Sequence, residues 1–288
     1  MTHTLNCRGR LLSLGQPRIM GILNLTPDSF SDGGRYMETP LAVARAGEML
    51  AEGADILDIG AYSSRPGAAD ISEAEEIRRL YEPVREIRAQ FPEAILSIDT
   101  FRPGVAAAML DLGIHIINDI RAGEGSLDPA QDSETMMQLV GRAGNVPYIM
   151  MHMKGTPQTM QQKPEYAHVA EEVRAFFIDK IREARAQGIR DLILDPGLGF
   201  GKSILHNYQL LAALPRFTAF DLPVMVGISR KSMLYRLFQS GPEDTVGVAS
   251  ALHLRAIEAG ARLLRVHDVR EAARIVQLYL YLREHGLI

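Results

Sequence analysis

Side chains that can accept hydrogen bonds recur at one kind of position in this chain, directly after a short apolar run. Asp99, Asn118 and Asp195 each follow such a run. Their carboxylate and amide oxygens suit a flat ligand that presents several N–H groups between apolar walls. Structural alternatives are a helix cap for Asp99 and a turn cap for Asn118 together with Asp119.

A second group of candidates is cationic. Arg265 lies inside an apolar run and His267 follows that run, while Arg65 lies in a polar stretch. These residues suit an anion, although a solvated loop position is the alternative for Arg65. Lys231 lies at an expected helix start, where a cation is unfavourable without a compensating partner. Lys231 is therefore a candidate functional residue.

The elements that must position these residues are eight short apolar runs, which are typical of buried parallel strands. The runs are residues 19–23, 56–59, 95–98, 114–117, 148–151, 192–194, 223–226 and 263–266. They recur every 35 residues or so, which is the length of a strand, helix and connection. The pattern predicts one domain over residues 1–288, a TIM (β/α)8 barrel with its site at the carboxyl ends of the strands. A doubly wound open sheet is the alternative, but its glycine fingerprint is absent.

Helical patterns separate the runs, over residues 41–52, 72–89, 103–112, 165–187, 245–259 and 269–286. Ser72 and Glu75 form a capping box, and Pro83 is expected to kink or split its helix. The stretches 26–37 and 62–71 are rich in Gly, Pro, Ser and Asp. We expect them to be loops over the barrel mouth.

Composition excludes several classes of protein. The net charge of −4 argues against nucleic acid as the main partner, and the single cysteine, Cys7, excludes an internal disulfide or a multi-cysteine zinc site. No apolar run is long enough to cross a membrane, and residues 1–16 lack the core of a secretory signal. A cytoplasmic protein is expected. The glycine-rich segment 197–203 fits neither a P-loop nor a dinucleotide fingerprint, and His115 and His152 are expected to be packed residues, not metal ligands.

Several segments in order resemble the signatures of the dihydropteroate synthase family. They are residues 22–34 (ILNLTPDSFSDGG), 58–67 (DIGAYSSRPG), 97–100 (SIDT), 117–119 (IND), 151–155 (MHMKG), 195–202 (DPGLGFGK), 227–232 (GISRKS) and 265–269 (RVHDV). The resemblance covers the chain from about residue 19 to the C-terminus. It implies a TIM barrel, a homodimer, and condensation of 7,8-dihydropterin-6-ylmethyl pyrophosphate with 4-aminobenzoate to 7,8-dihydropteroate and pyrophosphate.

The resemblance also implies roles for individual residues, with Asn24 as ligand of a Mg²⁺ cofactor. The implied pterin site comprises Asp99, Asn118, Met150, Asp195, Phe200, Gly227 and Lys231. The implied pyrophosphate site comprises Asn24, Ser64, Arg265 and His267. The implied aminobenzoate site comprises Phe30, Arg65, Pro66, Phe200 and Ser232. Catalysis is implied for Arg65, Asp99, Asp195 and Lys231.

The second signature departs from the family's usual Gly-Glu-Ser-Thr-Arg-Pro-Gly. Tyr62 replaces a carboxylate or an amide, and Ser64 lacks the methyl group of threonine. Two other functions stay open: a pterin-binding methyltransferase domain, and a non-catalytic relative that binds pterin or serves in an assembly. The presence of the loop with Arg65 together with Lys231 and Ser232 argues against the former. Asn24 and His267 argue against the latter.

Overall fold

The computed structural model describes residues 3–26, 34–63, 70–124, 134–156, 160 and 164–288. Eight parallel strands form one sheet in the order β8-β7-β6-β5-β4-β3-β10-β9. A bridge between Leu194 of β8 and Val224, just before β9, closes the sheet into the predicted barrel. The strands are β3 (Arg18–Asn24), β4 (Ile56–Gly60), β5 (Ile95–Asp99), β6 (Ile116–Asp119), β7 (Tyr148–Met151), β8 (Leu192–Asp195), β9 (Met225–Val226) and β10 (Leu263–Val266).

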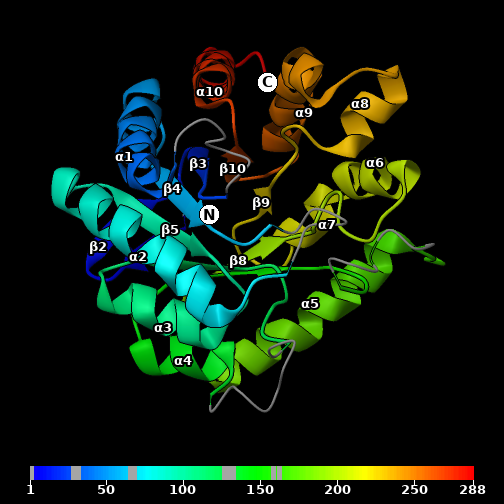
Figure 1. Ribbon diagram of the computed structural model, residues 1–288. Helices are drawn as coiled ribbons and strands as arrows, with labels where there is room; N and C mark the ends of the chain where they lie inside the picture. The colour runs from blue at the N-terminus through cyan, green and yellow to red at the C-terminus, as the bar shows by residue number, and fades with distance from the viewer. Residues whose placement is uncertain (1–2, 27–33, 64–69, 125–133, 157–159, 161–163) are drawn as a thin grey trace.

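Helices surround the strands (Figure 1). They are α1 (Gly34–Glu52), α2 (Glu73–Gln90), α3 (Pro103–Asp111), α4 (Met136–Ala143), α5 (Val169–Ala186), α6 (Ile204–Ala212), α7 (Leu214–Thr218), α8 (Ser232–Phe238), α9 (Val246–Glu258) and α10 (Val269–Glu284), with the 3-10 helix η2 (Pro242–Thr245) before α9. None of the helices in the described residues has the length and apolar character of a membrane crossing.

Two expectations about local structure are corrected. Pro83 does not split its helix, because α2 runs unbroken and buries Leu80, Val84 and Ile87 as well as Pro83. That buried face outweighs the loss of one backbone hydrogen bond. The expected loop 26–37 ends early, because α1 already begins at Gly34. The Ser72 cap is confirmed, with Ser72 Oγ accepting from the Glu75 amide at 3.2 Å.

A hairpin that the sequence analysis did not anticipate packs against the amino-terminal end of the barrel. Its strands β1 (Thr4–Cys7) and β2 (Arg10–Ser13) are antiparallel. Its apolar side chains join the lowest layer of the barrel interior in one cluster: Leu5, Cys7, Leu12 and Leu14 from the hairpin region, with Met20, Ile56, Ile116, Ile149, Ile193, Met225 and Leu263. The hairpin therefore buries the end of the barrel opposite the predicted site.

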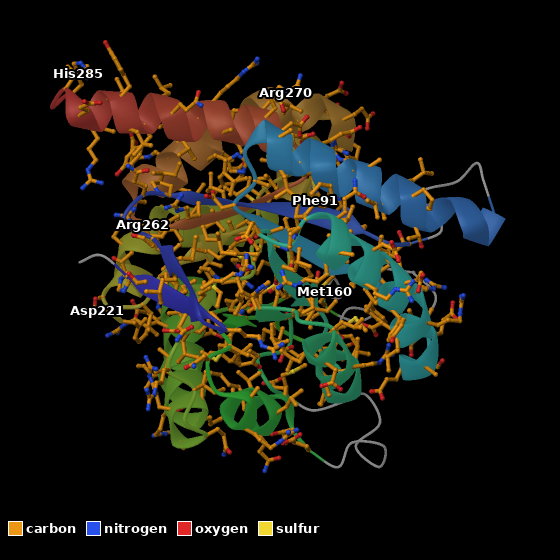
Figure 2. The ribbon with its side chains drawn as sticks, turned by 90° about the vertical axis from the view of Figure 1, so that its left-hand side faces the viewer. Phe91, Met160, Asp221, Arg262, Arg270 and His285 are labelled. Carbon is orange, nitrogen blue, oxygen red and sulfur yellow. The ribbon has the colours of Figure 1, made fainter. Side chains whose placement is uncertain are left out.

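The chain ends in α10, which lies beside α1. Figure 2 shows α10 with Arg270 near its start and His285 just beyond its carboxyl end. Arg270 forms an ion pair of 3.3 Å with Glu52, the last residue of α1. The last and first helices of the barrel are thus neighbours, as a closed barrel requires.

Candidate active site

Strand-end residues converge on the carboxyl end of the barrel, as predicted, and three of them form one network with Asp58 of β4. Arg265 donates from Nε to Asp58 Oδ2 and from Nη2 to Asp99 Oδ2, both at 2.6 Å. Asn118 donates to the same Asp58 oxygen at 2.9 Å. Asp58 is fully buried, whereas 22% of the Asp99 side chain is exposed. Asp58 therefore anchors the network, and Asp99 faces the open mouth.

The network changes the acidity of Asp99. Burial raises the pKa of Asp99 to about 7, which the charge of Arg265 opposes and the nearby Asp58 reinforces. Arg265 is bonded to two carboxylates, so an anion at this position would share the guanidinium with Asp58 and Asp99. Asp99 does not cap a helix, because α3 begins after Arg102 and its cap uses no side chain.

Asp195 and Lys231 lie on the other side of the mouth. Asp195 is 4% exposed and accepts from the Gly197 amide at 2.8 Å. Burial raises the pKa of Asp195 and lowers that of Lys231 to about 8, while the attraction between the two opposes both shifts. The Lys231 ammonium donates to the Leu198 carbonyl and lies 4.6 Å from the centroid of the Phe200 ring. Lys231 precedes α8 as its N-cap residue, so its helix-start position is confirmed.

Gly227 leaves room between these groups. A Cβ atom at this position would lie 3.5 Å from Lys231 Nζ and 3.9 Å from Arg265 Cβ. Ser232 is the first residue of α8 and is half-buried. Gly227 therefore lies beside Lys231 and Arg265 in the mouth, and the role of Ser232 stays a prediction.

The apolar wall of the mouth is a small cluster of its own, defined by Phe101, Ile120 and Met151 with the half-buried Tyr62, Met153 and Phe200. Met150 is not part of it, although the resemblance implied a ligand contact there. Met150 packs in the layer between strands and helices, because its neighbours on β7 alternate between the two faces. Met151, in register with Asp195, is the methionine that faces the mouth.

Asn24 and His267 lie on the β3 and β10 side of the mouth. Both line a cavity of about 500 Å³ together with Arg45 and Arg230. The Ser229 hydroxyl lies 3.3 Å from both the backbone nitrogen and Nδ1 of His267. No three His, Cys, Asp or Glu side chains in the described ranges gather closely enough to hold a metal ion by themselves.

A buried lysine and histidine were not expected to interact. Lys202 Nζ lies 3.0 Å from His152 Nδ1 and donates to the carbonyl oxygens of His152 and Phe200 at 3.2 and 2.9 Å. Burial lowers the pKa of Lys202 to about 7 and that of His152 to about 3. The pair ties the loop after β8, with Phe200, to the end of β7. The expectation that His152 and His115 are packed residues is confirmed, because both are buried.

Four predicted residues, Phe30, Ser64, Arg65 and Pro66, lie outside the described residues.

Asp119, which also ends a strand, does cap a turn. It accepts from the amides of Arg121 and Gly123 at 2.8 and 2.7 Å, and from the Tyr148 hydroxyl at 2.6 Å. Asp119 therefore supports the mouth from behind, and its neighbour Asn118 faces it.

Comparison with known proteins agrees with this site. Residues 20–267 match the family described as pterin binding enzyme. Dihydropteroate synthase of Escherichia coli strain K12 is 43% identical over 285 residues, which cover 96% of this chain and 97% of that protein. A Xanthomonas albilineans dihydropteroate synthase structure with 4-aminobenzoic acid has a TM-score of 0.88 and 40% identity, covering 98% of this chain and 99% of that one. A structure of the enzyme from that organism with 7,8-dihydropteroate has a TM-score of 0.85 and 38% identity, with the same coverage.

The family match and the fold together identify a pterin-binding enzyme built on a closed parallel barrel. The likenesses extend over nearly the full length of both chains and far exceed a likeness of fold alone. The chain belongs to the dihydropteroate synthase family.

Proposed function

We propose that this enzyme condenses 7,8-dihydropterin-6-ylmethyl pyrophosphate with 4-aminobenzoate and releases 7,8-dihydropteroate and pyrophosphate. The observation that carries the proposal is the ring of Asp99, Asn118 and Asp195 in one mouth with Lys231. The 2-amino and N3 groups of a pterin are donors that match carboxylates, and its O4 is an acceptor that Lys231 can meet. A relative with 7,8-dihydropteroate bound supports the same product.

The apolar wall supports the position of the second substrate. Phe200 lies against Lys231 and borders the cluster of Phe101 and Met151. In this proposal Phe200 and the start of α8 at Ser232 frame the aminobenzoate, together with Phe30, Arg65 and Pro66. Met151 takes the contact with the pterin ring that the resemblance gave to Met150. The Xanthomonas albilineans relative with 4-aminobenzoic acid supports this class of substrate.

The donor set at the other side of the mouth fits a magnesium ion. Mg²⁺ often takes only one or two protein oxygens and completes its shell with phosphate and water. The amide oxygen of Asn24 is such a ligand, and His267 lines the same cavity. In this proposal Asn24 would hold the metal, and His267, Ser64 and Arg265 would hold the pyrophosphate. When bound, the metal would neutralise charge on the leaving group.

The chemistry then needs no nucleophile from the protein. The amine nitrogen of aminobenzoate forms a bond to the pterin methylene carbon, and the bond from that carbon to the pyrophosphate oxygen breaks with its electron pair leaving on pyrophosphate. The amine then loses one proton to solvent. The electron-rich dihydropterin stabilises positive charge on the methylene. Asp99, Asp195 and Lys231 hold the ring, and Arg65 is proposed to steady the aminobenzoate. Positioning and electrostatics supply the rate.

We further propose that the enzyme is a cytoplasmic homodimer. Support for an interface comes from exposed apolar side chains late in the chain, with Leu237 and Phe238 in α8 and Tyr281 in α10 each more than half exposed. The single cysteine, Cys7, is free and buried, which suits a reducing compartment. Light scattering of the purified protein tests the dimer.

A turnover assay with both substrates tests the reaction. We expect stoichiometric dihydropteroate and pyrophosphate, and no turnover without aminobenzoate. Methyl transfer from a methyl donor in the presence of pterin would instead identify a methyltransferase domain. Tight pterin binding without any turnover would identify a non-catalytic relative.

A further inference from the structure

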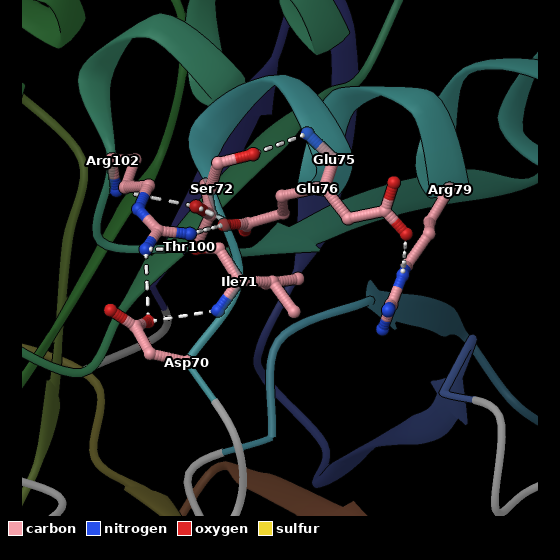
Figure 3. Close-up of polar contacts among 8 residues, drawn as sticks. All are labelled: Asp70, Ile71, Ser72, Glu75, Glu76, Arg79, Thr100 and Arg102. Atoms are coloured by element: carbon pink, nitrogen blue, oxygen red, sulfur yellow. Dashed lines mark hydrogen bonds and ion pairs between the residues drawn. The ribbon is translucent and has the colours of Figure 1, made fainter.

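Arg102, three residues after Asp99, lies in a polar network that the proposed reaction does not use (Figure 3). Only 8% of its side chain is exposed, and its Nη1 donates to Glu76 Oε2 at 2.5 Å. Glu76 is fully buried, and its other oxygen accepts from the Thr100 hydroxyl at 2.8 Å. The Arg102 amide donates to the same hydroxyl at 3.2 Å. Glu76 on α2 thus fixes both the guanidinium and the backbone of Arg102.

The same guanidinium contacts the chain on both sides of the stretch 64–69. On the far side, Nη2 donates to Asp70 Oδ1 at 3.2 Å and to the Ile71 carbonyl at 2.7 Å. On the near side, the Tyr62 ring lies with its centroid 5.2 Å from Arg102 Cζ. One buried side chain therefore joins the two described flanks of a stretch on which Ser64, Arg65 and Pro66 are predicted to contact substrates.

Tyr62 extends this contact into the apolar wall of the mouth. Its ring meets the Phe101 ring edge-on with centroids 5.0 Å apart, and both belong to the cluster that includes Phe200. Tyr62 is also one of the residues at which this signature departs from the usual family pattern, and its ring face contacts Arg102.

The charges in the network argue for a positional role. Arg102 carries one positive charge, and Glu76 and Asp70 supply two negative charges within bonding distance. The guanidinium is thus compensated, and with only 8% of its side chain exposed it is poorly placed to meet an anionic substrate. Its forked shape instead lets it bond several groups from different parts of the chain at once.

We propose that Arg102 is a positioning residue for the aminobenzoate side of the mouth. It holds Tyr62 and the Asp70–Ile71 backbone against the strand end that carries Asp99. The inference rests on the proposed function, because it assumes that this side of the mouth receives the aminobenzoate. If this side of the mouth is misplaced while Asp195 and Lys231 stay in position, binding of aminobenzoate should weaken and binding of the pterin substrate should not.

The test compares the Arg102→Lys variant with the wild-type enzyme. The variant keeps the positive charge that compensates buried Glu76 but loses the forked guanidinium. We expect the KM for aminobenzoate to rise on the order of tenfold. The Kd of the pterin substrate should stay within about twofold of wild type, since Asp99 bonds to Arg265 and not to this network. The matched control is Arg79→Lys, which alters a half-buried pair of 2.7 Å between Arg79 and Glu75 on α2, the helix that carries Glu76 (Figure 3). The control should leave both constants unchanged.

Two milder variants test whether both flanks act through Arg102. Tyr62→Ala and Asp70→Asn should each raise the aminobenzoate KM in the wild-type background. Neither should raise it further in Arg102→Lys, because the contact they remove is already lost. Full additivity in the double variants would overturn the proposal. An unchanged aminobenzoate KM in Arg102→Lys, or equal weakening of both substrates, would also overturn it.

The same comparison can be made without turnover. The Kd of aminobenzoate is titrated in the presence of magnesium pyrophosphate for each variant. Absence of turnover in the wild-type enzyme would count against the proposed function alone. An aminobenzoate Kd that rises in Arg102→Lys and not in Arg79→Lys would still support the role of Arg102, and equal Kd values would refute it.

Discussion

Asp99 and Asp58 offer a matched pair of perturbations, because both carboxylates bond the same guanidinium of Arg265 at 2.6 Å. Asp99 faces the mouth, and Asp58 is fully buried behind it. Replacement by asparagine keeps the shape of either side chain and removes its charge. We expect Asp99→Asn to impair pterin binding and Asp58→Asn to impair stability.

The size of the first effect follows from the bonds lost. Hydrogen bonds to charged groups contribute about 1.5–3 kcal/mol, so the pterin Kd of Asp99→Asn should rise by about tenfold to about 150-fold. Stability should not fall with it. The pKa of Asp99 is raised by burial to about 7, above its value in the unfolded chain, so the ionised form opposes folding above that pH. Removing the charge leaves Arg265 paired with Asp58, and we expect the Tm at about pH 8 to be equal or higher.

Asp58→Asn should behave in the opposite way. Both Arg265 and Asn118 lose a charged acceptor; Asn118 is buried, and the Arg265 side chain is 17% exposed. The thermal midpoint should therefore fall. Loss of the negative charge at Asp58 also lowers the pKa of Asp99, because that charge is one of the causes of its elevation. Asp99 would then stay ionised to a lower pH than in the wild type.

Calorimetric titration with the pterin substrate from about pH 5.5 to about pH 8.5 separates these effects. Wild-type affinity should rise as pH rises through about 7, because the ionised carboxylate accepts both pterin N–H groups. The rise should vanish in Asp99→Asn and move to lower pH in Asp58→Asn. The reasoning is refuted if wild-type affinity does not vary over this range. It is equally refuted if Asp99→Asn binds pterin normally or loses as much stability as Asp58→Asn.

Three further predictions concern other parts of the mouth. Asp195→Ala should weaken pterin binding by about tenfold or more, and unchanged affinity in calorimetry would exclude Asp195 from the pocket. Because burial lowers the pKa of Lys231 to about 8, pterin affinity should fall as pH rises through that value. Lys231→Met should bind pterin more weakly and should not show this fall. Aminobenzoate should bind more tightly with magnesium pyrophosphate present, by about 1–3 kcal/mol, and Asn24→Ala or His267→Ala should reduce that coupling. Equal affinity with and without magnesium pyrophosphate would show that the aminobenzoate site is preformed.

The barrel and its mouth were predictable because they depend on repetition. Each apolar run ends on a polar residue, and parallel strands bring those ends together whatever the intervening helices do. Asp99, Asn118, Asp195 and Arg265 were placed correctly for this reason. The helices mattered less, so the wrong expectations of a split at Pro83 and of a loop up to residue 37 did not disturb the site.

The hairpin was missed because its signals are short and its turn is unusual. Arg8 and Gly9 both have positive φ, 54° and 95°, where an Asn-Gly pair is typical of such a turn. The apolar alternation is only Leu5, Cys7 and then Leu12, too brief to stand out from the polar residues around it. Its stability comes from the barrel layer that it covers, which is a contact distant in sequence.

The buried pairs were missed for a related reason. Glu76 and Arg102 are separated by 26 positions, and Lys202 and His152 by 50. A lone buried charge costs several kcal/mol, so a charged residue among apolar neighbours usually has a partner. The sequence alone does not say which. Glu76 belongs to the apolar-facing positions of its helix, beside Leu80 and Val84, and that placement is the one signal that a cation must reach it.

Met150 and Met151 show how much depends on the phase of a strand. Both lie within the same apolar run, and only alternation decides which one faces the mouth. Ile149 packs in the lowest layer of the barrel interior, so Met151, two residues on, must also point inward. Its register partner Asp195 points inward as well, two residues after Ile193 of that same layer. One inward position on β7 therefore determines the other, and alternation assigns Met151 to the inside of the barrel mouth without reference to any ligand.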